Sequence, residues 1–289
     1  MRIGLFAINY GTCAEPASAV RVARHAEAAG LESVWTGEHL ALPTPQPEGY
    51  AIAPTLPFLD TIVALTLVAA NTTSITVASG IIALPLHHPV MLAKQLASID
   101  HVADGRLIVG LGAGYVEAEF AAMGVALAER GRRMDEHLDA MHELWSADRP
   151  EYHGRFVDFA DIDAQPRPRQ PSGLHIVLGG VSDGARRRAV MKANGWYAFN
   201  TTQAMASEAV EVIAADQKRY DRPPELGPLE ITMTPVGHFD RDVVDWYQEL
   251  GVDRLVLLPR PTAPREHRHD PVSVEDTLRT IDAAASWLS

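Results

Sequence analysis

Short apolar segments rich in β-branched residues alternate along this chain with segments in which apolar residues recur every three or four positions. The first pattern is typical of buried parallel strands, and the second of helices that pack against them. We expect strands at residues 2–9, 33–36, 75–79, 106–111, 175–178, 196–200, 230–236 and 254–258. Helical sequence follows each of these segments, so the pattern predicts eight strand–helix units.

Proline and glycine mark where several of the helices begin and end. The first helix is expected to end at Gly30, because glycine suits the left-handed residue that follows a helix. The third is expected to start at Pro89 and to stop before Gly105, because proline fits the first turn of a helix. Further helices are expected at residues 58–71 and 134–145, and from a capping box of Ser273 and Asp276 to residue 288.

Eight such units predict a (β/α)₈ TIM barrel, which commonly fills a chain of 289 residues as one domain. An open doubly wound sheet uses the same alternation, but it carries a glycine-rich turn after its first strand. Residues 9–12 read NYGT and lack that signature, which favours the barrel. We expect one domain over residues 1–289, with an excursion outside the barrel at about 148–170, where prolines replace the helical period.

Charge and cysteine content restrict the binding partners and the cellular compartment that the protein can have. The 25 Lys and Arg against 37 Asp and Glu give a net charge of -12, which disfavours nucleic acid and anionic membrane surfaces as partners. The single cysteine, Cys13, is expected to be a small apolar filler, and it fits a reducing compartment. The chain has neither a secretion signal nor an apolar run of membrane-spanning length, so we expect a soluble, cytoplasmic protein.

The active site of a barrel lies at the C-terminal ends of its strands, and two ionisable residues follow the strand at 33–36. His39 can take up or release a proton near neutral pH, and the adjacent Glu38 could fix its tautomer or contact a ligand. On these residues alone, a solvated loop pair stays an alternative.

Glycines follow the strands at 106–111 and 175–178. Gly112 and Gly114 would let a flat ligand approach the backbone, with Tyr115 packing against it, although tight turns also use this spacing. The second group precedes a helix expected near residue 183, so its backbone N–H groups and one hydroxyl could bind a phosphate. It comprises Gly179, Gly180, Val181 and Ser182.

Histidines raise the question of a metal site, because His87 adjoins His88 and His267 lies near His269. Neither pair has supporting ligands at suitable spacing, so we expect no metal. The sequence also lacks the GxSxG nucleophile elbow and the P-loop.

Taken together, these segments resemble the luciferase-like monooxygenase family, and within it the branch that depends on the deazaflavin F420. The resemblance runs nearly the full length. Its most specific segments are AEAAGLESVWTGEHL, ITVASGIIALPLHHPVMLAKQLASIDHVADGRLIVGLGAGYVEAEFAAMG, ERGRRMDEHLDAMHELW, HIVLGGVSDGARRRA and NGW.

The resemblance implies a bacterial-luciferase-like barrel with a flavin or deazaflavin ring lying across the strand ends. It places His39 near the reacting ring carbon. It implies a non-prolyl cis peptide between Gly80 and Ile81 behind the ring, a phosphate-contacting loop at residues 179–182, and a weaker phosphate contact at Arg132. Two departures stand out, because LPLHHP replaces an arginine-containing segment and Tyr115 stands where one subgroup has a glutamate.

The function expected from this resemblance is hydride transfer between F420 and a small organic substrate. One alternative is an FMN-dependent monooxygenase that receives reduced flavin from a separate reductase, and another is a cofactor-binding protein without turnover. The resemblance also implies a homodimer and a flavin or F420 reductase as a functional partner.

Overall fold

The computed structural model describes residues 1–47, 52–171, 173–237, 239–261 and 271–288. Eight parallel strands form a closed barrel, in which each strand pairs with its neighbours and β3 pairs with β5 to complete the ring. The eight are β1 (Arg2–Leu5), β2 (Ser33–Thr36), β3 (Thr76–Ser79), β5 (Leu107–Gly112), β8 (His175–Gly179), β9 (Gly195–Thr201), β10 (Glu230–Pro235) and β11 (Arg254–Leu257). The predicted TIM barrel is therefore confirmed.

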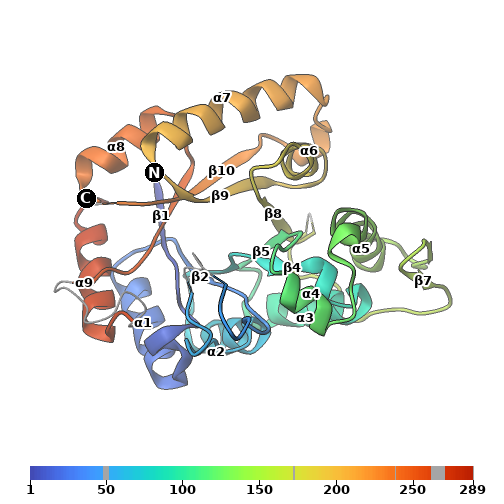
Figure 1. Cartoon of the computed structure of the whole chain (residues 1–289), viewed down its shortest axis with the longest axis horizontal. Coiled ribbons are helices and arrows are strands. Elements are labelled where there is room, and N and C mark those ends of the chain that lie inside the picture. Colours follow the sequence, from blue (N-terminus) through green and yellow to red (C-terminus); the bar gives the residue numbers. More distant parts are fainter. Residues whose placement is uncertain (48–51, 172, 238, 262–270, 289) are drawn as a thin grey trace.

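Helices surround the strands, as Figure 1 shows. They are α1 (Pro16–Ala28), α2 (Thr61–Asn71), α3 (Pro89–Val102), α4 (Glu117–Ala122), α5 (Arg130–Ser146), α6 (Asp183–Lys192), α7 (Gln203–Arg219), α8 (Arg241–Glu249) and α9 (Val274–Ala285). Short elements add β4 (Ile82–Ala83), β6 (Tyr152–His153), β7 (Asp158–Phe159) and the 3₁₀ turns η1 (Gly11–Ala14), η2 (Leu84–Leu86), η3 (Leu127–Glu129) and η4 (Pro224–Leu226).

The helix boundaries follow from their caps. Gly30 adopts φ +84° after α1, and Ser273 accepts a hydrogen bond from the Asp276 N–H at the start of α9, both as predicted. Helix α2 begins three residues later than expected, because the Asp60 carboxylate accepts hydrogen bonds from the N–H groups of Ile62 and Val63. Helix α9 ends at residue 285 rather than at the predicted residue 288.

The apolar residues divide into two cores. A large outer core lies between barrel and helices, and it includes Cys13, whose buried thiol has its pKa raised by desolvation to about 11. The prediction of an apolar filler at Cys13 is thus confirmed. A smaller core fills the barrel itself, and its buried members come from seven of the eight strands or from the residues directly after them. Its buried residues are Phe6, Ala7, Trp35, Ala78, Ile108, Val177, Tyr197 and Val256.

The first strand is shorter than the sequence predicts. We expected residues 2–9, but β1 ends at Leu5, and Ala7 adopts φ +73°, which no strand continues through. The prediction failed because the apolar run continues beyond Leu5, although its last residues lie in the barrel mouth rather than in the sheet.

The third barrel strand is interrupted at its C-terminal end. The Gly80–Ile81 peptide is cis, which confirms the prediction. Strand β3 ends just before this bond and β4 starts just after it, and both pair with β5.

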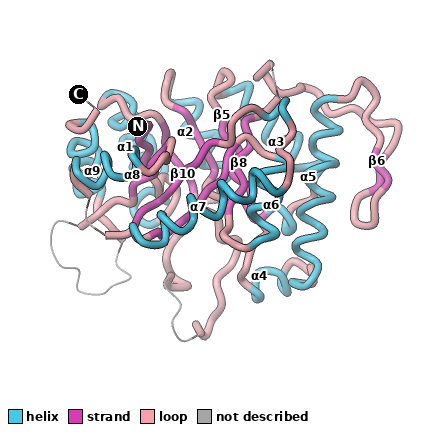
Figure 2. Tube along the Cα trace, turned by 90° about the horizontal axis from the view of Figure 1, so that it is seen from above, coloured by secondary structure: helices cyan, strands magenta, loops and turns pink. Residues whose placement is uncertain are grey.

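Residues 148–170 contain the antiparallel β6–β7 hairpin, which lies beyond α5 and apart from the barrel in both views (Figures 1 and 2). The Arg133 guanidinium of α5 stacks 4.3 Å from the Phe156 ring centroid. The returning chain is tied to α3 by Asp100, whose fully buried carboxylate accepts hydrogen bonds from the Arg169 and Gln170 N–H groups at 2.7 and 3.1 Å. The assignment of residues 1–289 to one domain stays a prediction.

Replacing Asp100 by alanine should lower the free energy of unfolding by about 3 kcal/mol, because it leaves partly buried N–H groups without an acceptor. Urea unfolding followed by circular dichroism measures this loss. Asp148→Ala, at an exposed position, is the control and should change the value by less than about 0.5 kcal/mol. Equal losses in the two variants would show that Asp100 does not anchor the returning chain.

Candidate active site

A pocket opens where β2 ends, between the loop at residues 37–40 and the turn at residues 58–61. Asn9 holds these two walls together. Its side-chain amide donates 2.8 Å hydrogen bonds to the carbonyls of Gly37 and Leu59, and its Oδ1 accepts one from the Gly37 N–H. The sequence does not reveal this role, because Asn9 falls within the predicted first strand at residues 2–9, whereas β1 ends at Leu5.

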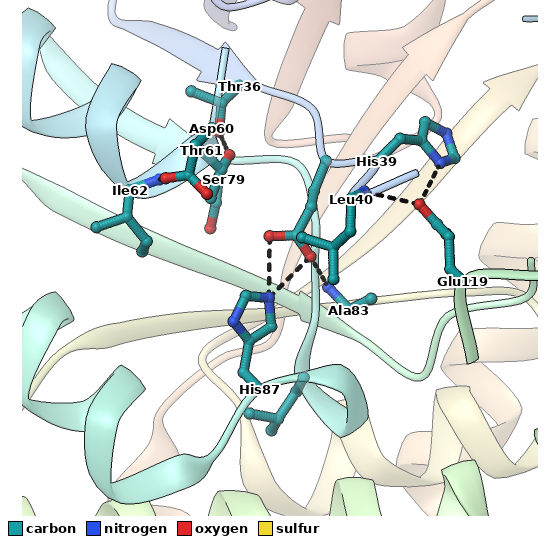
Figure 3. Close-up of polar contacts among 12 residues, drawn as sticks. Thr36, His39, Leu40, Asp60, Thr61, Ile62, Ser79, Ala83, His87 and Glu119 are labelled. Atoms are coloured by element: carbon teal, nitrogen blue, oxygen red, sulfur yellow. Dashed lines mark hydrogen bonds and ion pairs between the residues drawn. The ribbon is translucent and has the colours of Figure 1, made fainter. Parts of the chain in front are cut away.

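His39 lines this pocket, with a side chain that is only 10% exposed. Its imidazole makes edge-to-face contacts with the rings of Phe58 and Tyr115, at centroid distances of 5.5 and 6.1 Å. Its Nδ1 lies 3.3 Å from Glu119 Oε1 (Figure 3). The predicted catalytic histidine therefore lies at the C-terminal end of the barrel with a carboxylate beside it.

The carboxylate beside His39 belongs to Glu119 on α4, a residue that the sequence did not single out. The same Oε1 atom accepts hydrogen bonds from the N–H groups of Leu40 at 2.7 Å and Ala41 at 3.3 Å. Glu119 is buried, but the segment EAEFAA also contains Glu117, so nothing in that segment set Glu119 apart. Its partner His39 lies 80 residues earlier in the sequence, so the segment around Glu119 gives no indication of the pairing.

Glu38 does not contact the His39 ring, so the hypothesis that it fixes the tautomer of His39 is wrong. Its buried carboxylate accepts a 2.7 Å hydrogen bond from the Ala83 N–H and lies 3.1 and 3.2 Å from His87 Nε2. Successive residues of the loop point to different sides, and Figure 3 shows His87 and Glu119 on opposite sides of it. Glu38 thereby connects the end of β2 to the segment after the cis peptide.

The pairing with Glu38 changes the acid–base behaviour of His87. Burial alone lowers the pKa of His87, but the hydrogen bond to the Glu38 carboxylate and its negative charge raise it by more, so the pKa lies above its ordinary value. The pair is largely shielded from solvent, with side chains 17% and 4% exposed.

The glycines of the barrel mouth pack around Ile81. A Cβ atom added at Gly112 or at Gly179 would overlap Ile81 Cδ1, so both glycines make room for this side chain. Gly114 has φ +73°, and a Cβ there would lie 2.8 Å from the ring of Phe120. The structure thus gives these glycines packing roles, and their contact with a ligand stays a prediction.

The remaining predicted residues lie around the same end of the barrel. Tyr115 and Val181 are 69% and 60% exposed. Gly180 adopts φ +114°, and Ser182 caps α6 by accepting a 3.3 Å hydrogen bond from the Ala185 N–H.

Arg132 is exposed on α5, which α6 contacts through Arg188. The Arg188 guanidinium donates hydrogen bonds to the Asp135 carboxylate at 2.7 and 3.0 Å and to the Gly131 carbonyl at 3.0 Å. The loop at residues 179–182, which precedes α6, and Arg132 on α5 therefore belong to adjacent parts of the structure.

Metal ligands and membrane-spanning helices are the two remaining features to consider in the described part of the chain. No three His, Cys, Asp or Glu side chains among the described residues come together as metal ligands, and His267 and His269 lie outside the described part of the chain. Over the same residues, no helix has both the length and the apolar character needed to cross a membrane.

The raised pKa of His87 predicts a pH-dependent contribution to stability. Protonated His87 pairs with Glu38, so its contribution is complete below the unfolded-state value of about 6.5 and is lost as pH rises through the higher folded-state pKa. His87→Asn should therefore cost more free energy of unfolding at pH 6 than at pH 9, as measured by urea unfolding. A cost that is the same at both pH values would contradict this assignment.

Comparison with known proteins places the chain in a family. Residues 1–264 match the family model described as luciferase-like monooxygenase. An uncharacterized protein of Mycobacterium tuberculosis is 28% identical over 246 residues, covering 82% of this chain and 83% of that protein. The oxygenase component of the flavin-dependent trigonelline monooxygenase of Acinetobacter baylyi is 28% identical over 194 residues, covering 66% of this chain and 50% of that protein.

A solved structure of an F420-dependent secondary alcohol dehydrogenase, in complex with an F420–acetone adduct, has the same fold. It superposes with a TM-score of 0.77 at 15% sequence identity, covering 99% of this chain and 97% of that one. Since the matching family model spans most of the sequence, the protein belongs to the luciferase-like monooxygenase family of oxidoreductases.

Proposed function

We propose that this protein is an F420-dependent oxidoreductase that interconverts a small alcohol and its carbonyl compound. The observation that carries the proposal is His39, placed in the pocket at the end of β2 with its Nδ1 beside a carboxylate. Among the described residues its Nε2 has no hydrogen-bond partner, so that nitrogen is available to a substrate hydroxyl. Such a reaction needs a proton acceptor at this position, because an alcohol that loses a hydride must also lose its hydroxyl proton.

When bound, the deazaflavin supplies the hydride chemistry, and the protein holds and orients it. The mouth of the barrel offers apolar surface to a flat ring, since large apolar side chains stay exposed around it. They follow or end four different strands: Leu40, Tyr115, Val181 and Phe199, which are 38%, 69%, 60% and 42% exposed. Apolar side chains gathered around a few polar groups are typical of a cofactor site.

Two backbone segments would hold the remaining parts of the cofactor. Gly80 and Ile81 would lie behind the ring, and Glu38 would support this segment through Ala83 rather than touch the ring. The N–H groups of residues 180–182 precede α6, so they would bind a phosphate, with Arg132 on the adjacent α5 as a second contact.

The second candidate function is that of an FMN-dependent monooxygenase, which the similarity to the oxygenase component of a flavin-dependent enzyme favours. It would use the same pocket with molecular oxygen, and it would need a partner reductase to deliver reduced flavin. A protein that binds a cofactor without turnover would not need His39.

Separate titrations with F420 and with FMN, followed by fluorescence, decide between the cofactors. We expect tighter binding of F420, and turnover when oxidised F420 is supplied with 2-propanol as a probe alcohol. Tighter binding of FMN, with oxygen consumption when reduced FMN is supplied, would support the second candidate instead.

His39→Ala should lower turnover by about 100-fold or more, because it removes the proton acceptor. Cofactor affinity should stay within about three-fold and the Tm should change little, since the role is chemical rather than structural. His153→Ala, on the exposed β6–β7 hairpin, is the matched control and should keep wild-type turnover. His39→Ala protein that turns over near the wild-type rate would remove His39 from the mechanism.

We further propose a cytoplasmic homodimer. Val63 of α2 and Met91 of α3 are 53% and 62% exposed on neighbouring helices, and a two-fold interface would bury such side chains. Light scattering at micromolar concentration should therefore give about twice the mass of the 31.4 kDa chain. A mass near that of one chain would contradict the dimer.

A further inference from the structure

We infer that Glu119 is a positioning residue that makes Nε2 the proton-accepting nitrogen of His39. The inference rests on the function proposed above and adds to it a residue from a different strand–helix unit. It follows from the contacts that Glu119 Oε1 makes with the loop after β2.

Glu119 Oε1 lies 3.3 Å from His39 Nδ1, and it accepts hydrogen bonds from the N–H groups of Leu40 at 2.7 Å and Ala41 at 3.3 Å in the same short segment. An ionised carboxylate can only accept hydrogen bonds, so the contact with His39 requires the proton on Nδ1. The neutral imidazole then carries its lone pair on Nε2. A ring in the other tautomer would place two lone pairs against each other at this contact.

Glu119 has no positively charged lysine or arginine partner among the described residues. Its side chain is 6% exposed. A buried carboxylate needs hydrogen-bond donors or a positive partner. When His39 takes up a proton at Nε2, the resulting imidazolium lies beside this carboxylate and is stabilised by it.

Glu119 is held in place by the packing of α4. The neighbouring Phe120 is buried under Gly114, and Val116 at the start of the helix is also buried. The carboxylate therefore has two separable roles, since it anchors the loop through the N–H groups of Leu40 and Ala41 and it orients the His39 ring.

The tautomer can be measured without turnover. Long-range ¹H–¹⁵N correlation spectra of the full-length protein, with the His39 signals assigned by their loss in His39→Ala, should show the neutral ring protonated on Nδ1. Glu117→Gln, an exposed change on the same helix, should leave this pattern intact. Protonation of the neutral ring on Nε2 in the wild type would overturn the inference.

A double-mutant cycle separates orientation from anchoring. Glu119→Gln keeps an oxygen for the loop N–H groups but removes the charge, so with F420 and 2-propanol it should lower kcat by about 10-fold while KM stays within about three-fold. In the His39→Ala background the same change should have no further effect, because Glu119 acts through His39. Equal losses in both backgrounds, or an unchanged kcat in Glu119→Gln, would make Glu119 a loop anchor only.

The two proposals fail in different ways. Wild-type turnover in His39→Ala would contradict the proposed role of His39, while the spectra would still decide whether Glu119 sets its tautomer. Loss of turnover in His39→Ala together with an unaffected Glu119→Gln would contradict the role of Glu119 alone.

Discussion

The loop that follows β2 enters the mouth of the barrel, where its polar groups are partly withdrawn from water and need partners within the protein. Buried N–H and C=O groups without partners are costly, and this requirement shapes the whole site. Asn9 satisfies the backbone of Gly37, and Glu119 satisfies the backbone of Leu40 and Ala41. Each partner comes from a different strand–helix unit, so three units together hold this loop in place.

The two ends of the barrel use polar groups differently. At the N-terminal end, the Arg254 side chain is 2% exposed and pairs with Glu32 at 2.9 Å and with Glu230 at 3.1 Å. That cluster is satisfied internally, as expected for the end of a barrel that serves stability. At the C-terminal end, His39 lines the pocket, and the apolar side chains of Leu40, Tyr115, Val181 and Phe199 stay exposed to solvent.

The sequence predicted the eight strands well, because burial on both faces leaves continuous β-branched segments, and it placed His39 correctly at the end of one of them. It could not predict where the first strand ends, since residues after Leu5 stay apolar in the barrel mouth. Nor could it pair His39 with Glu119 or Glu38 with His87. Those contacts join segments far apart in the sequence, so they depend on how the strand–helix units pack together and on which side of the loop each side chain occupies.

The glycines show why a motif alone does not establish a cofactor site. Gly112 and Gly179 belong to the segments that resemble the family most, yet Ile81 fills the space that their missing side chains leave. Both glycines therefore have a packing role in this barrel whether or not a cofactor binds. The stronger argument for catalysis is the polar pair at His39 and Glu119. The Glu119 carboxylate anchors the loop through the N–H groups of Leu40 and Ala41, and the same oxygen also lies beside a pocket histidine. The loop does not require that second contact, whereas proton transfer would use it.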